Sequence, residues 1–228
     1  MPWVVAMDWI DALFLHWPLD AAQLRDKVPL DLAIDTYEGS AWISIVAFKI
    51  AGARPRGVPR ALAWRTFPEI NVRTYVTGAG HAGVWFFSLD ADSRLAVAVA
   101  RLGVNLAYHR ASIRTEFAAD SARFGLVRTQ ADAPAARFAA QAAFGGDARV
   151  SAPGSLDQFL AERYCFFTRD RSGRTRRGDV THQPWALRDA IVQTEENTLI
   201  SSLGIDVAPR HALAHASPGV ATRGWPLR

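Results

Sequence analysis

Short apolar runs, bounded by glycine, proline and acidic residues, recur along the whole chain. The runs are rich in β-branched and aromatic residues, which favour strands. The expected strands cover residues 12–17, 30–35, 41–50, 67–76, 83–90, 108–117, 123–130, 136–144 and 187–194. A glycine-rich turn over residues 77–82 joins two of these strands, so 67–76 and 83–90 are expected to pair as an antiparallel hairpin. A second hairpin is expected around Ser172–Gly173.

Helical signals are few and short. Asp20 and Ser155 are placed to cap helices over residues 20–27 and 156–162, and further helices are expected over 94–103 and 197–203. Many strands with few helices indicate a β-rich α+β domain, because a doubly wound parallel sheet needs regular helical crossovers. The chain shows no internal repeat and no linker, so we expect a single domain over residues 1–228, with 208–228 as a loosely structured C-terminal tail.

The strand 67–76 has one polar face, and its opposite face carries Ile70, Val72, Thr74 and Val76. Side chains on a strand point to opposite faces in turn, so one face carries Glu69, Asn71, Arg73 and Tyr75. If this face points to solvent, the charges are surface charges. If it points inward, they need partners, because buried charges are costly when unpaired. We expect the second arrangement, with Glu69 lining a pocket.

Composition limits the class of protein. Half of the 228 residues are hydrophobic, which favours a sizeable core over disorder. The single cysteine, Cys165, leaves no internal disulfide and fits a reducing compartment. The first residues lack a basic signal-peptide region, and no apolar run is long enough to span a bilayer. We therefore expect a cytoplasmic protein without membrane contact.

The charged residues and histidines show no motif for nucleic-acid, metal or cofactor binding. The basic cluster over residues 169–177 lies at the second expected hairpin, where solvated charges are common, and no nucleic-acid recognition motif accompanies it. Arg101 ends an apolar helical run, where it either meets the helix dipole or binds an anion. The six histidines form no zinc motif, and no phosphate-binding glycine loop precedes a helix. We expect neither a metal nor a cofactor, and no nucleic acid.

Several motifs together resemble the YqjF-like family, a domain of unknown function, over nearly the whole chain. They are Phe14-Leu-His-Trp17, Val28-Pro29, Leu32-Ala-Ile-Asp35, Gly39-Ser-Ala-Trp42, residues 67–76, residues 83–90, Ala100-Arg101, Phe159-Leu-Ala-Glu-Arg-Tyr164, His182-Gln-Pro-Trp185 and Ser217-Pro-Gly-Val220. Their order and spacing are specific for family membership. They say nothing about activity.

That family in turn resembles the acetoacetate decarboxylases, which fold as a closed, cone-like β-barrel around an internal pocket. The resemblance implies a closed antiparallel β-barrel with a few short helices. In those enzymes a lysine forms a Schiff base with the substrate. Aligned with this chain, their arginine falls on Arg101, their lysine pair on Tyr108 and His109, and their glutamate on Glu69. Tyrosine forms no imine, and neither Lys27 nor Lys49 matches the motif, so Schiff-base decarboxylation is not expected.

Together these observations predict a protein that binds a small carbonyl or carboxylate compound in an internal barrel pocket. The expected ligand-binding residues are Glu69, Arg73, Tyr75, Arg101 and Tyr108. One alternative is an enzyme of lyase or isomerase type that works by acid–base chemistry, with Glu69, Tyr108 and His109 as candidates. Another is a purely structural or interaction protein, whose barrel would be filled. A homo-oligomer is compatible with the sequence.

Overall fold

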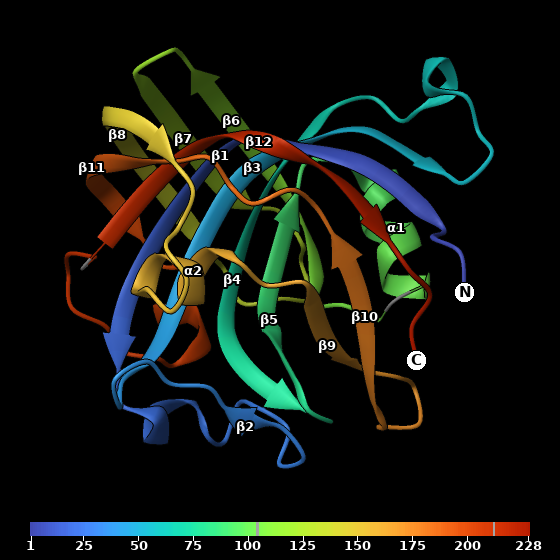
Figure 1. Cartoon of the computed structure of the whole chain (residues 1–228), viewed down its shortest axis with the longest axis horizontal. Coiled ribbons are helices and arrows are strands. Elements are labelled where there is room, and N and C mark those ends of the chain that lie inside the picture. Colours follow the sequence, from blue (N-terminus) through green and yellow to red (C-terminus); the bar gives the residue numbers. More distant parts are fainter. Residues whose placement is uncertain (104, 212) are drawn as a thin grey trace.

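The computed structural model describes residues 1–103, 105–211 and 213–228 (Figure 1). The strands are β1 (Val5–Leu19), β2 (Ala33–Ile34), β3 (Ala41–Pro55), β4 (Phe67–Gly78), β5 (His81–Ala91), β6 (Tyr108–Phe117), β7 (Ser121–Arg128), β8 (Arg137–Arg149), β9 (Cys165–Arg169), β10 (Thr175–Thr181), β11 (Leu187–Asn197) and β12 (Leu213–Gly224). The helices are α1 (Arg94–Gly103), α2 (Leu156–Ala161) and the short 3-10 helices η1 (Ala21–Leu24), η2 (Arg60–Leu62) and η3 (Ser201–Leu203). The described chain is therefore β-rich with few helices, as expected.

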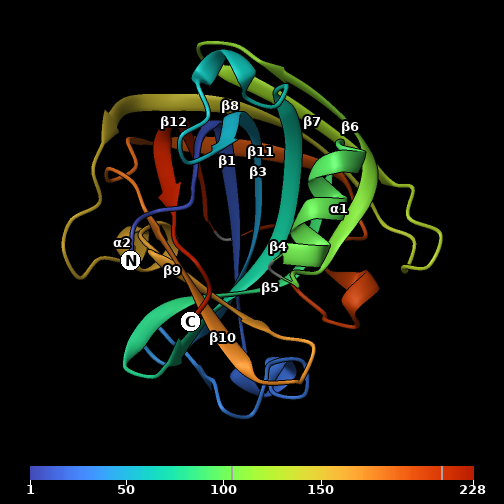
Figure 2. The ribbon, with the colours of Figure 1, turned by 90° about the vertical axis from the view of Figure 1, so that its right-hand side faces the viewer.

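Five neighbouring strands, β12-β1-β3-β4-β5, form one layer. This shared layer belongs to two rings of paired strands, which we call the first and the second cycle. The first cycle leaves this layer at β5 and returns to β12 through β6, β7, β8 and β11. The second leaves at β5 and returns through β9 and β10. In Figure 1 the strands β6–β8 lie behind the shared layer and β9 and β10 lie in front of it. Figure 2, seen from the side, places α2 and β9 on the left and β6 on the right.

The sheet is mixed, which corrects the expectation of a purely antiparallel one. β5 pairs in parallel with both β6 and β9, whereas the other strand pairs are antiparallel among the described residues. Parallel neighbours need a crossover connection, and α1 supplies it between β5 and β6. The crossover matters for the site because it sets the start of β6 beside the end of β5.

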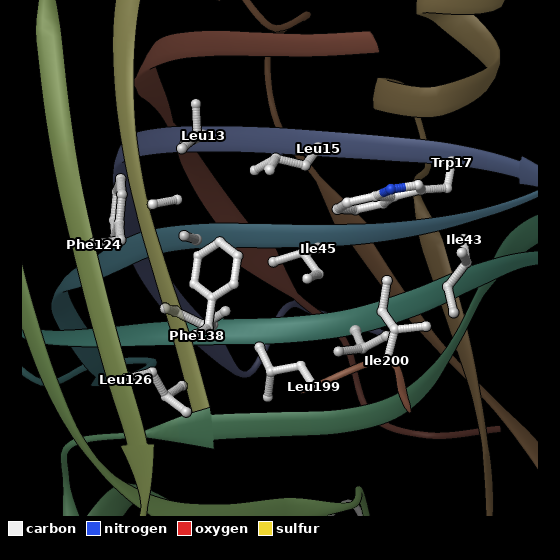
Figure 3. Packing of buried hydrophobic residues seen from close by; sticks show 14 of the residues in the cluster. Leu13, Leu15, Trp17, Ile43, Ile45, Phe124, Leu126, Phe138, Leu199 and Ile200 are labelled. Atoms are coloured by element: carbon white, nitrogen blue, oxygen red, sulfur yellow. The ribbon is translucent and has the colours of Figure 1, made fainter. Parts of the chain in front are cut away.

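Hydrophobic side chains, most of them aliphatic, fill the space inside the first cycle and form what we call the aliphatic core (Figure 3). β1 and β3 contribute from the shared layer, and β7 and β8 face them from the far side. The residues labelled in the view are Leu13, Leu15, Trp17, Ile43, Ile45, Phe124, Leu126, Phe138, Leu199 and Ile200. From β4 this core takes Ile70, Val72 and Val76, the face of the strand opposite to Glu69. Burial of this apolar area is the main stabilising contribution to the fold.

Several expected elements are confirmed. α1 and β6 have the expected bounds, and both hairpins form, β4 with β5 and β9 with β10. The expected helix over 20–27 shortens to η1, and the strand over 30–35 shortens to β2. No helix among the described residues is long and apolar enough to cross a bilayer.

The expectation of a loosely structured tail over 208–228 is wrong. Residues Leu213–Gly224 form β12, which pairs with β1 on one edge and with β11 and β10 on the other. Its alanine, proline and glycine content is low in strand propensity. The long ladder with β1, together with short pairings to β11 and β10 on the other edge, nevertheless holds this segment as a strand, so tertiary context overrides local propensity.

Candidate functional site

The second cycle of strands encloses a cavity of about 560 Å³. It lies on the face of the shared layer opposite to the aliphatic core, and β9, β10, α1 and residues 225–227 complete its wall. The wall is mostly apolar and rich in aromatic rings, including Trp9, Phe14, Phe48, Phe67, Phe86 and Trp185. A largely apolar cavity of this size with a few polar groups has the usual properties of a small-molecule site.

Glu69, which is buried, and Tyr108, which is half-buried, form a hydrogen-bonded pair in this wall. The Glu69 side chain is only 2% exposed. The Tyr108 hydroxyl donates a hydrogen bond of 2.8 Å to Glu69 Oε2. Strand register brings the two together, because Asn71 of β4 lies opposite Leu89 of β5, and Leu89 lies opposite Tyr108. The pair therefore depends on the crossover through α1.

Burial changes the acidity of both groups. Loss of hydration raises the pKa of Glu69 from 4.5 to about 7, although hydrogen bonds from Tyr108 and Asn71 lower it in part. Burial, followed by the charge of Glu69, raises the pKa of Tyr108 well above its usual value. Near neutral pH, Glu69 is thus divided between its protonated and ionised forms while Tyr108 keeps its proton.

Arg73 presents a cation to the cavity without a matching carboxylate. Its Nη2 donates to the carbonyl oxygen of Leu160 over 2.9 Å, and its guanidinium lies 5.9 Å from the Phe14 ring and 5.7 Å from the Tyr75 ring. Its Nε is buried and has no hydrogen-bond partner. Among the described residues, no carboxylate lies within 4.0 Å of this guanidinium. Arg73 is therefore available to a ligand anion.

A second cavity arginine, Arg163, is already paired. Its Nη1 lies 2.7 Å from Asp35 Oδ2, and its Nε donates to the Phe159 carbonyl over 2.7 Å. The sequence analysis did not select Arg163 or Trp185 as site residues. The available signal was their position inside two of the family motifs quoted above.

Two predicted ligand-binding residues lie away from the cavity wall. The Tyr75 hydroxyl is buried in an internal network, 2.7 Å from Ser44 Oγ and 2.9 Å from the Leu160 carbonyl. Arg101 has 43% of its side chain exposed and lies 4.0 Å from Asp132. Ala100 of the same helix lines the cavity, and one further residue turns the side chain by about 100°, which carries Arg101 outward.

His109 does not join Tyr108 at the cavity. Consecutive strand residues point to opposite faces, so His109 lies on the other face of β6. Burial and the nearby charge of Arg128 lower the pKa of His109. Arg128 itself holds Asp90 in a buried bidentate pair with two 2.7 Å hydrogen bonds.

The cavity wall offers neither a lysine nor a metal site in the part of the chain that the structure describes. Lys49 Nζ lies 2.7 Å from Asp11 Oδ2, and Lys27 Nζ lies 3.4 Å from Asp26 Oδ2, and neither lysine lines the cavity. Within the same residues, no group of three or more histidine, cysteine or acidic side chains is arranged to hold a metal ion.

Sequence comparison connects the chain with an uncharacterized family. The profile of the DUF2071 family, described as an uncharacterized conserved protein, matches residues 6–221. The chain is also 38% identical over 231 residues to the uncharacterized protein YqjF of Bacillus subtilis (strain 168), covering 99% of this chain and 92% of that protein. These matches confirm the first resemblance that the motifs indicated.

Structure comparison connects the fold with acetoacetate decarboxylase-like proteins. Acetoacetate decarboxylase from Legionella pneumophila superposes with a TM-score of 0.64 at 11% identity, over 98% of this chain and 85% of that one. The enduracididine biosynthesis enzyme MppR complexed with pyruvate gives a TM-score of 0.67 at 10% identity, over 100% and 90% of the two chains. Identity this low shows a shared fold alone.

Proposed function

The chain belongs to the DUF2071 (YqjF-like) family, and from this premise we propose that it binds a small carboxylate or carbonyl compound in the cavity of the second strand cycle. We also propose that the two cycles act as a closed, barrel-like enclosure, as in the acetoacetate decarboxylases. Glu69, Tyr108 and Arg73 would supply the polar contacts, and the aromatic wall would supply most of the buried area.

The observation that carries the proposal is Arg73. A guanidinium at an apolar cavity without a carboxylate partner loses hydration and gains little in return. A ligand carboxylate would offset that cost through charge-assisted hydrogen bonds from the guanidinium, which makes no ion pair within the described part of the chain.

Binding rather than Schiff-base catalysis fits the cavity wall. Schiff-base chemistry needs a desolvated amine next to the substrate. At the aligned position the chain carries Tyr108, whose hydroxyl is engaged with Glu69. Schiff-base chemistry is therefore not part of the function that we propose.

A second candidate function is acid–base catalysis on the bound compound. The observation that favours it is the pKa of Glu69, raised to about 7. A general acid or base works best when its pKa lies near the working pH, and Glu69 meets that condition while Tyr108 keeps it oriented. Such an enzyme would be of lyase or isomerase type and would use acid–base catalysis without a covalent lysine intermediate.

Isothermal titration with a panel of monocarboxylates, compared with the corresponding amides, tests the proposal. We expect at least one carboxylate to bind and its amide to bind far more weakly. Removal of a charged donor to a desolvated anion costs about 2–5 kcal/mol, so Arg73→Gln should raise the Kd of the carboxylate by about 30-fold to several thousand-fold. Arg114→Gln, at an exposed position on β6, is the matched control. Equal binding of the acid and its amide, unaffected by Arg73→Gln, would refute the anion site.

A further inference from the structure

Two charged groups of the cavity, Glu69 and Arg73, lie at separate positions along one strand, with the amide of Asn71 between them. Glu69 and Arg73 are four residues apart on β4, which corresponds to about 13 Å along a strand. Across the shared layer, Arg73 lies in register with Ser44 and Glu69 with Phe48. A compound of three or four carbons is much shorter than this backbone separation, whereas a longer ligand spans more of the distance between the two charged residues.

Aromatic rings on the neighbouring strands border the interval between these two charged positions. Phe14 of β1 lies in register with Val46, which lies in register with Asn71 midway between Glu69 and Arg73. The Arg73 guanidinium already rests 5.9 Å from the Phe14 ring. The wall at this interval therefore offers a ring face next to a cation.

The aromatic wall continues from Phe14 without a break. Trp185 meets Phe14 edge-on at 5.1 Å, and Trp9 stacks on Trp185 at 6.2 Å with an interplanar angle of 8°. Trp9 also packs against Phe48, the residue in register with Glu69. Aromatic pairs favour offset-stacked and edge-to-face contacts, so a planar ring in this space gains contacts that a flexible chain of equal area does not.

Building on the proposed function, we propose that the ligand is an arylalkanoic acid with a polar group on the far side of its ring. Its carboxylate binds Arg73, its ring packs against Phe14 and Trp185, and its distal hydroxyl or carbonyl contacts Glu69. The cavity volume of about 560 Å³ agrees with this size, because cavities of about 300–1,000 Å³ hold ligands much larger than pyruvate.

A ligand series on the wild-type protein tests each part of the proposal by calorimetry at pH 7. The main probe is 3-(4-hydroxyphenyl)propanoate. Its comparators each lack one feature: 3-phenylpropanoate lacks the hydroxyl, octanoate lacks the ring, propanoate and pyruvate lack the tail, and 3-(4-hydroxyphenyl)propanamide lacks the charge. We expect the main probe to bind at least about tenfold more tightly than every comparator.

Two substitutions assign the contacts. Trp185→Leu should reduce the preference for the aryl acid over octanoate while retaining binding of both, a change that a general loss of stability would not produce. Trp185 is buried, so its replacement can prevent folding. The second variant is therefore Trp9→Leu, which changes a half-buried position of the same wall. Glu69→Gln should alter the ratio of the affinities for 3-(4-hydroxyphenyl)propanoate and 3-phenylpropanoate. It should leave the ratio of the affinities for 3-phenylpropanoate and octanoate unchanged.

The outcomes separate this inference from the proposed function. If propanoate or pyruvate binds as tightly as the aryl acids and Arg73→Gln weakens that binding, the proposed function stands and the aryl ligand is refuted. If octanoate equals the main probe, the aromatic part is refuted. If the acids and the amide bind equally, or none of the carboxylates binds, the proposed function fails together with the inference.

Discussion

Replacement of Glu69 by glutamine should make the protein more stable at high pH. The unfolded-state pKa of this group is near 4.5, and burial raises its pKa in the folded protein to about 7. The folded state therefore holds the proton more tightly, and ionisation at higher pH favours unfolding. Each pKa unit corresponds to about 1.4 kcal/mol, so the ionised Glu69 costs the folded state about 3 kcal/mol.

The sign and the range of pH follow from these values. Below pH 4.5 the group is protonated in both states, and Glu69→Gln should change stability little. As the pH rises from 4.5 to about 7, the wild type loses about 3 kcal/mol of unfolding free energy that the variant keeps. A glutamine oxygen still accepts the hydrogen bond from Tyr108, so the substitution preserves the contact seen for Glu69 Oε2.

Urea denaturation of ligand-free protein between pH 4.5 and 9 measures this difference. The gap between variant and wild type should widen steadily up to about pH 7 and then become constant. Glu116→Gln, an exposed glutamate of β6, controls for the loss of one negative charge. Parallel curves for Glu69→Gln and wild type would mean that Glu69 ionises normally in the folded protein, and the reasoning about its burial would be wrong.

Three further predictions concern the backbone, the lysines and the ligand. Gly219→Ala should destabilise the protein by more than about 1 kcal/mol in urea denaturation, because Gly219 has a φ of +122° and an added Cβ would lie 2.1 Å from the Trp9 carbonyl oxygen. The control is Gly125→Ala, which should be nearly neutral because the added Cβ meets open space. Borohydride reduction in the presence of acetoacetate should leave the protein mass unchanged, and an adduct on either lysine would restore Schiff-base chemistry. Carboxylate affinity should fall as the pH rises through 7, because ionised Glu69 adds a negative charge to the cavity, and an affinity independent of pH in Glu69→Gln is the check.

Much of the fold was predictable from local patterns. The alternation in residues 67–76 correctly separated Glu69, Asn71 and Arg73 from Ile70 and Val72, because β4 keeps a regular pleat. α1 was predictable because its apolar run has caps and no competing strand pattern. β12 was not, since its propensity is poor and only its neighbours on both edges stabilise it.

The site was less predictable than the strands that carry it. Arg101 was selected by alignment with a family motif, but the last turn of α1 points it toward Asp132 at the surface. Arg163 and Trp185 lie far from Glu69 in the sequence and reach the cavity only because β9 and β10 fold across the shared layer. No periodic pattern encodes such a long-range contact. The motifs that contain these two residues were the only local signal.

Irregular strand positions explain the aromatic wall itself. Strict alternation would place Phe86 and Leu89 of β5 on opposite faces, yet both line the cavity. The cause is a bulge: the pairing with β4 shifts register between Val72 and Arg73, which gives β5 one extra residue, Phe87. That extra residue packs into the aliphatic core instead.

β1 also contains a β-bulge, at Asp11. Its pairing with β3 shifts between Ile10 and Leu13, and Asp11 has a φ of +56°. Trp9 and Phe14, five positions apart, therefore share the cavity face. A regular strand would turn one of these rings toward the core or the solvent. The aromatic character of the cavity is thus set by two bulges, and Gly219, whose missing Cβ lets β12 approach Trp9, belongs to the construction of the site although it contacts no ligand group.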